Sequence, residues 1–235
     1  MFHVSAPLLQ PPSLFIAESE DHDTNARSIV CVHGLGGTAG STWYSEQSGK
    51  SWTSDADFLD DALKDKVRIM TYNYNADVAA NMTGASIALH ATDLLGLLLA
   101  VMGRGVSWPL VFVAHGFGGQ IVKKALLLAQ HVAAYRSVGH SMAAILFLGT
   151  PHQADDAGAL LAAVRVSATL MARRGSRVAD EDVREFAEAV RETNAEFQGP
   201  PSARLKLCSF WEGKTTLVSP KGEEPYETMV SVFDS

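Results

Sequence analysis

The chain has little cysteine and no excess of basic charge. Among its 235 residues are only two cysteines, and acidic side chains outnumber lysines and arginines to give a formal net charge of -7. Cys31 and Cys208 lie far apart and in no Cys-x-x-Cys spacing, which argues against a disulfide framework or a zinc site. No Lys/Arg cluster is present, so we expect no nucleic-acid partner. The sequence predicts neither a metal nor a cofactor.

Long hydrophobic runs are also absent. The longest apolar stretch, Leu94 to Met102, is too short for a transmembrane helix, which needs about 20 residues. The N-terminus shows no basic region followed by an apolar core, so no secretory signal is predicted. From these absences we expect a cytoplasmic protein without a transmembrane segment.

What the chain does contain is an alternation of strand-like and helix-like segments. Apolar, β-branched segments are typical of strands at Leu14–Ala17, Ser28–Val32, Val67–Tyr74, Leu110–Val113, Met142–Leu148, Leu205–Trp211 and Glu227–Phe233. Helical patterns cover Asp55–Lys64, Ala85–Met102, Gly118–Val132, Ala157–Arg173 and Asp180–Phe197. This order predicts an α/β fold with a mostly parallel central sheet flanked by helices on both faces.

The same pattern predicts the domain organisation. Residues 1–27 form an N-terminal segment with a first strand, residues 28–235 form one α/β domain, and residues 157–197 form a helical lid. In open parallel sheets, ligands bind at the carboxyl ends of the strands. Three glycine-containing turns are expected at that edge, at His33–Gly37, Ala114–Gly119 and Gly149–His152.

The second of these turns is the most informative, because a residue is missing from it. Val111 to Gly119 reads as a buried strand, a sharp turn and a helix, which is the setting of the nucleophile elbow Gly-x-Ser-x-Gly. Here Gly116 stands at the serine position and Ala114 replaces the first glycine. Glycine adopts the strained elbow backbone without penalty, so the fold should persist without the nucleophile. A plain strand–helix turn remains the alternative.

The first turn has two interpretations. In a hydrolase, the turn with His33 and Gly34 supplies one oxyanion-hole amide, and Phe117, next to the nucleophile position, supplies the other. Alternatively, Gly34-x-Gly36-x-x-Ala39 fits a dinucleotide-binding fingerprint. The segment that follows looks like a loop instead of a helix, and the nucleotide interpretation leaves the other two turns unexplained.

A general base is hard to find in this sequence. A hydrolase of this kind places its histidine after the last strand, yet no histidine follows His152. His115 lies in the elbow and would point under the turn, whereas His131 and His140 flank a helix end and are expected on the surface. His152 is expected to make structural hydrogen bonds.

The acid is ambiguous as well. Glu212 and Asp234 each follow a predicted strand, so each is a candidate for the catalytic acid, and each could equally be a solvated loop carboxylate. Asp155 and Asp156 are expected to cap the helix that follows them.

Several segments together resemble a known family. They are His33–Gly37, Trp43 and Trp52 with Asp57–Leu59, Arg68–Asp77, Phe112–Leu126 and Phe147–His152. In this order they are similar to the lipase-like α/β-hydrolase domains of the serine-active-site-containing and GPI-inositol-deacylase-like group. Such domains often stand at the N-terminus of fungal NACHT or ankyrin proteins. The resemblance covers roughly residues 28–235.

This resemblance implies an α/β-hydrolase fold and hydrolysis of lipid-like or other acyl esters. The family usually has Gly-His-Ser-x-Gly-Gly, so Gly116 takes the nucleophile position, and Leu35 and Phe117 take the oxyanion amides. Phe210-Trp211-Glu212 matches a Phe-Tyr-Glu-like segment of the family. Family members continue to a catalytic histidine beyond the point where this sequence stops, so we expect a short version or a fragment of a larger multidomain protein.

We therefore predict a lipase- or esterase-like domain that lacks both nucleophile and base. As a degenerate homologue it would bind a lipid or acyl-ester ligand without turnover. Two alternatives stay open. One is a fragment or variant of an active serine ester hydrolase, and the other is a nucleotide-binding α/β domain.

Overall fold

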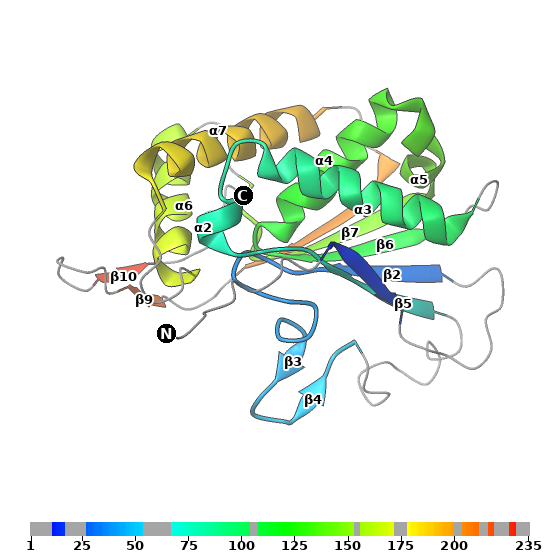
Figure 1. Ribbon diagram of the computed structural model, residues 1–235, viewed down its shortest axis with the longest axis horizontal. Coiled ribbons are helices and arrows are strands. Elements are labelled where there is room, and N and C mark those ends of the chain that lie inside the picture. Colours follow the sequence, from blue (N-terminus) through cyan, green and yellow to red (C-terminus); the bar gives the residue numbers. More distant parts are fainter. Residues whose placement is uncertain are drawn as a thin grey trace, which may run out of the picture.

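A mostly parallel sheet forms the centre of the molecule. The computed structural model describes residues 11–16, 27–53, 67–103, 108–152, 156–171, 178–199, 204–211, 216–218 and 226–228. The sheet has six strands in the order β1-β5-β2-β6-β7-β8. Their bounds are β1 Ser13–Ile16, β2 Arg27–Val32, β5 Val67–Asn73, β6 Leu110–His115, β7 Met142–Leu148 and β8 Lys206–Phe210. Only β1 runs antiparallel to its neighbour, which confirms the predicted α/β class with a mostly parallel sheet; of the two faces predicted to carry helices, the described helices cover one (Figure 1).

Helices cover one face of this sheet (Figure 1). They are α3 (Ser86–Met102), α4 (Gly118–His131) and α5 (Arg136–Ser141). The short helix α2 (Val78–Asn81) lies between β5 and α3, and the single turn η2 (Ala133–Tyr135) joins α4 to α5. The opposite face carries a small hairpin formed by β3 (Tyr44–Ser45) and β4 (Lys50–Ser51). The helix predicted at Asp55–Lys64 lies outside the described residues.

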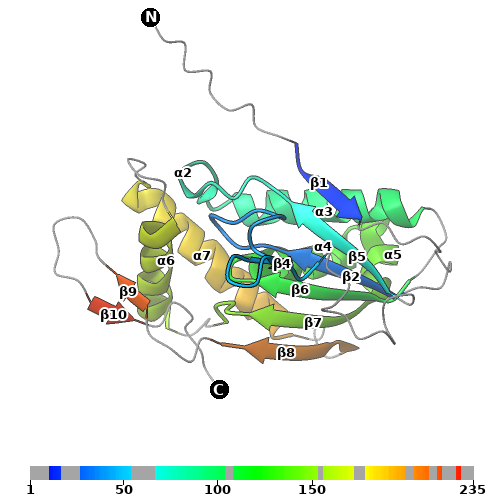
Figure 2. The ribbon, with the colours of Figure 1, turned by 90° about the horizontal axis from the view of Figure 1, so that it is seen from below.

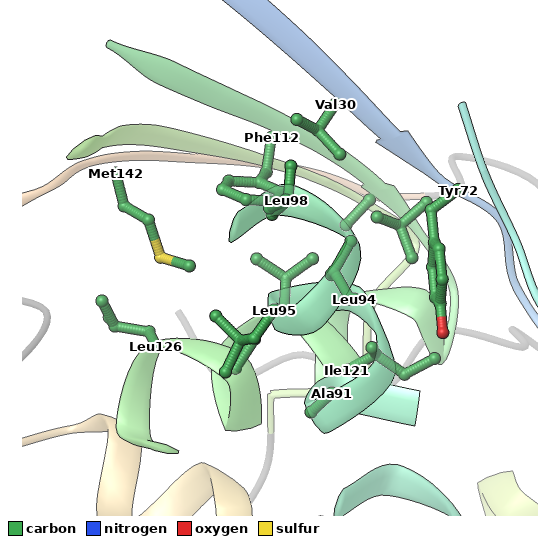
Figure 3. Packing of buried hydrophobic residues seen from close by; sticks show 14 of the residues in the cluster. Val30, Tyr72, Ala91, Leu94, Leu95, Leu98, Phe112, Ile121, Leu126 and Met142 are labelled. Atoms are coloured by element: carbon green, nitrogen blue, oxygen red, sulfur yellow. The ribbon is translucent and has the colours of Figure 1, made fainter. Parts of the chain in front are cut away.

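The main core lies between the sheet and the helices α3 and α4 (Figure 3). Ala91, Leu94, Leu95 and Leu98 recur every three or four residues along α3, so they share one helix face and are fully buried. They meet Phe112 of β6 and other sheet residues in a single apolar cluster. Because the elbow is the link between β6 and α4, this packing holds it from both sides.

Two further helices lie at the carboxyl ends of the parallel strands (Figure 2). α6 (Ala157–Met171) and α7 (Asp180–Phe197) pack against each other. Their apolar faces form a second buried cluster that includes Leu35 and Phe117, one residue from each of two turns. The helix pair therefore covers the two turns that the sequence identified.

The chain's last described strands do not join the central sheet. β9 (Thr216–Val218) and β10 (Tyr226–Thr228) pair with each other in a separate antiparallel sheet. The strand predicted at Glu227–Phe233 overlaps β10 only in part, and its remainder is outside the described residues. No helix in the described part of the chain has the length and apolar character needed to cross a membrane.

Candidate active site

The elbow at Gly116 has the backbone geometry of a nucleophile position. Gly116 has a φ of 53°, in the left-handed region, and every described residue other than glycine avoids positive φ. Its amide donates to Leu148 O at 2.8 Å, and its carbonyl accepts from Thr150 Oγ1 at 2.9 Å. Both backbone groups are thus held by the end of β7 and the turn that follows it, so the position is fixed.

Neighbouring glycines let the turns pack against one another. A Cβ on Gly118 would run into the carbonyl oxygens of Val32 and His33, and a Cβ on Gly119 would run into the Thr150 side chain. Gly116 differs, because the nearest heavy atom to its Cβ position is Gly34 Cα at 3.8 Å. The space for a nucleophile side chain is present, and the side chain itself is missing.

Two backbone amides next to Gly116 are available as donors. Within the described part of the chain, neither the Leu35 nor the Phe117 N–H is seen to donate a hydrogen bond. The Leu35 and Phe117 side chains are buried, with exposed fractions of 8% and 7%, and they pack into the apolar cluster beneath α6 and α7. The turn is further held by the Gly36 amide, which donates to Ala76 O at 2.8 Å. The arrangement suits an oxyanion hole, which uses amide donors fixed before the ligand arrives.

A solved structure settles the fold around this elbow. A lipase from Bacillus licheniformis, BlEst2, solved in its propeptide form, superposes with a TM-score of 0.51 over 87% of this chain and 40% of that chain, at 22% identity. This chain has the α/β-hydrolase fold. At this level of identity the likeness concerns the fold alone. No protein-family profile matches the chain.

Sequence relatives point to one further protein. Protein SERAC1 of Mus musculus is 28% identical over a stretch that covers 53% of this chain and 21% of the relative. Protein SERAC1 of Danio rerio is 27% identical and covers 82% of this chain and 31% of the relative. This hydrolase-fold chain therefore spans less than a third of the length of the curated relatives it matches.

His33 shapes the oxyanion turn and is not free to act as a base. It is fully buried and stacks on Tyr74 with ring centroids 4.3 Å apart. The Tyr74 amide donates to His33 Nε2 at 3.4 Å, so Nδ1 carries the proton and donates to Gly34 O at 3.1 Å. Burial lowers the pKa of His33 to about 4. The imidazole is a neutral support for this turn.

His152 is held by a lysine. Lys123 Nζ lies 2.8 Å from His152 Nδ1 and donates to Asn194 Oδ1 at 2.7 Å. While Lys123 is protonated, His152 Nδ1 accepts from it, and Nε2 then bears the proton and faces Ser209 Oγ at 3.3 Å. Burial, reinforced by the Lys123 charge, lowers the pKa of His152 to about 3. In this protonation state His152 donates to Ser209, and it makes the hydrogen bonds expected of a structural residue.

Lys123 is the residue that sequence reasoning missed. Its side chain is 1% exposed, and its ammonium lies 5.3 Å and 5.4 Å from the ring centroids of Phe147 and Phe197. Burial lowers the pKa of Lys123 to about 7. In the sequence it is followed by Lys124, which is partly exposed and pairs with Glu196 at 3.0 Å. Only the position on the inner face of α4 distinguishes the two lysines.

The other histidines differ in their distance from the elbow: His115 lies next to the Gly34 turn, since a Cβ at Gly34 would be 3.1 Å from His115 Nδ1. His115 continues the alternation of Val111 and Val113 along β6, so it is exposed on the face that carries the β3–β4 hairpin. This agrees with a side chain that lies beneath the turn. His131 and His140 are exposed, as expected for surface residues.

The candidate acids are not placed by the structure. Glu212 and Asp234 lie outside the described residues, as does Asp155; Trp211 is the last described residue after β8. Asp156 behaves as predicted, because its Oδ1 accepts the Ala159 amide at 2.8 Å and caps α6.

Proposed function

We propose that this chain is a non-catalytic hydrolase-fold module that binds a lipid or acyl-ester ligand without turning it over. One observation carries the proposal: the elbow position has the backbone conformation, fixation and free space of a nucleophile, and it is occupied by glycine. Removing the nucleophile of a serine triad costs about 10⁶ in kcat in a well-studied enzyme.

The histidines around the turns support the same conclusion. His33 accepts an amide and donates to a carbonyl, and His152 accepts from Lys123. A general base needs an imidazole nitrogen that is free to accept the nucleophile's proton. Neither histidine offers one, so a serine introduced at Gly116 would find no base in either.

Ligand binding is supported by what the site retains. The Leu35 and Phe117 amides can donate to a carbonyl oxygen, and the cluster between the turns and the helices α6 and α7 is apolar. An acyl group has both features, a carbonyl acceptor and an alkyl chain. The share of the SERAC1 proteins that the chain covers further supports a module that belongs to a larger protein.

The test compares the chain with Gly116→Ala and Gly116→Ser. Hydrolysis of p-nitrophenyl acetate and octanoate is measured alongside calorimetric binding of 2-decanone, a non-hydrolysable acyl analogue. We expect no turnover by the unmodified chain, measurable ketone binding, and weaker binding to Gly116→Ala, whose methyl fills the space beside Gly34. Turnover by the unmodified chain in proportion to its concentration would refute the proposal.

An active serine ester hydrolase is the second candidate, favoured by the open space at the Gly116 Cβ position. Ester hydrolysis by Gly116→Ser, with fluorophosphonate labelling that Gly116→Ala lacks, would favour it. The nucleotide alternative has less support, because the turn at Gly34–Ala39 leads into the β3–β4 hairpin and not into a helix. A dinucleotide fingerprint needs a helix N-terminus there. Calorimetry with NAD or ATP should show no binding.

A further inference from the structure

A hollow lies at the opposite end of the sheet from the elbow. It has a volume of about 470 Å³ and is bounded by α4, α5 and the residue Arg204. The chain leaves α5 directly into β7, and Arg204 stands two residues before β8, so the hollow is at the amino ends of these strands. In Figure 2, α5 lies at the far end of the sheet from α6 and α7.

This hollow concentrates positive charge on an acidic protein. Its lining includes the two arginines Arg136 and Arg204 and no acidic residue, although the whole chain has a net charge of -7. Neither arginine forms an ion pair or hydrogen bond with any other described residue. Two other arginines do have partners: Arg191 pairs with Glu188 at 2.6 Å and Arg165 with Asp180 at 3.4 Å.

The floor beneath these charges is apolar and closely packed. Leu126 and Ala129 of α4 are 2% and 1% exposed. A Cβ at Gly139 would lie 2.9 Å from the Ala129 Cβ, so the glycine lets α5 approach α4. The hollow thus combines a closely packed floor with a rim that carries two guanidinium groups, and its volume of about 470 Å³ exceeds the need of a bare inorganic anion.

We propose that this hollow binds the phosphate monoester group of a small organic molecule. A guanidinium fork pairs with two oxygens of a phosphate, and a tetrahedral dianion can offer oxygens to more than one fork at once, which a carboxylate does less well. The rim then holds the phosphate of the ligand, and the rest of the hollow, about 470 Å³ in all, accommodates its organic body. The site does not depend on the function proposed for the elbow.

The test is calorimetric titration of the chain with phenyl phosphate, inorganic phosphate and benzoate. We expect phenyl phosphate to bind at least about tenfold more tightly than either other probe. Arg136→Gln and Arg204→Gln should each weaken phenyl phosphate binding by about tenfold, the size of one lost charge-assisted contact. Arg165→Gln and Arg191→Gln remove the same charge elsewhere on the surface and should leave binding unchanged. Urea unfolding midpoints check that all four variants fold.

Each other outcome would overturn part or all of the proposal. Equal weakening by the control arginines would mean a general charge effect. If inorganic phosphate bound as tightly as phenyl phosphate, the hollow would not recognise the organic part of the ligand. If benzoate bound as tightly, the hollow would not prefer phosphate to carboxylate. Vesicles of phosphatidylcholine with and without phosphatidic acid identify the source of the monoester. Retention on the phosphatidic acid vesicles that Arg204→Gln abolishes supports a lipid monoester, whereas vesicle binding without phenyl phosphate binding overturns the small-molecule site.

Discussion

The elbow and the Lys123 network differ in what each contains: the elbow has the backbone geometry of a nucleophile position, and the network has polar side chains. At the elbow, Gly116 has the fixed backbone, free amide neighbours and open space that a nucleophile needs, and it has no side chain. Around Lys123, a lysine, His152 and Ser209 stand in hydrogen-bonding sequence. There the reactive groups are present, but the lysine is buried and the histidine nitrogen that faces Ser209 is a donor.

This difference shows that a shifted pKa does not by itself mark a catalytic residue. Such shifts cluster at active sites, but buried structural networks produce them as well. Here burial lowers the pKa of Lys123 and of His152, and both residues tie α4 and the turn after β7 to α7. At the elbow, by contrast, the nucleophile position itself has no side chain, because Gly116 occupies it.

Among substitutions at the elbow, Gly118→Ala should destabilise the protein most. The added Cβ would meet the backbone carbonyls of Val32 and His33, which cannot move without displacing β2. We expect a loss of about 3 kcal/mol or more in the free energy of unfolding, at the upper end of overpacking effects. Urea denaturation measures it. Gly96→Ala is the control, because a Cβ at Gly96 has nothing within 4 Å and should be neutral or stabilising; equal effects in both would contradict the packing of the two turns.

Lys123→Met tests whether burial of Lys123 makes the free energy of unfolding depend on pH. The unfolded lysine keeps its proton up to a pKa of 10.5, whereas the buried amine loses it at about 7. Between these values the unfolded chain binds more protons, so stability rises with pH. From pH 7 to 8.5 we expect a slope of up to about 1.4 kcal/mol per pH unit, the value for one proton. Lys123→Met should remove this slope.

The matched control is Lys124→Met, which removes the same charge from the neighbouring, partly exposed position. Urea unfolding at several pH values compares the three proteins. Lys124→Met should keep the slope of the unmodified chain. If Lys123→Met keeps it too, the lysine is charged in the folded protein and the burial argument is wrong.

The sequence predicted the fold well because long periodic segments decide it. The predicted helix Asp180–Phe197 and strand Met142–Leu148 have the observed bounds, since each has one consistent apolar pattern. The elbow was also predictable, because glycines at fixed spacing after a buried strand have few other uses. The final strand was not, because short β-branched segments do not specify which neighbour they pair with; β10 pairs with β9.

The Lys123 network could not be read from the sequence for a different reason. Its partners His152, Asn194 and Ser209 come from a turn, a helix and an edge strand that are far apart along the chain. Nothing in the pair Lys123-Lys124 tells which ammonium is buried, because that depends on how α4 is rotated against α7. The candidate acids Glu212 and Asp234 remain predictions.

A smaller effect is expected for Gly116→Ser. The side chain has room beside Gly34, but a residue with a Cβ is strained at a φ of 53°. We expect a loss of about 1–2 kcal/mol in unfolding free energy, the usual cost of the left-handed conformation. Gly116→Ala should lose the same amount, because the strain comes from the Cβ. A loss similar to that of Gly118→Ala would show that the space at the elbow is not available to a side chain.

The smallest effect is expected for Ser209→Ala. Ser209 is exposed and its contact with His152 Nε2 is long, at 3.3 Å. We expect a loss of less than about 0.5 kcal/mol, as for other exposed substitutions, measured by urea unfolding. We also expect no change in p-nitrophenyl acetate hydrolysis at pH 6, where Lys123 is protonated and His152 donates to this serine. If the substitution removed a real esterase activity, the proton on His152 would have to be on the other nitrogen, and Lys123 would have to be neutral. Ser209 and His152 would then carry the activity, and the elbow at Gly116 would have no part in it.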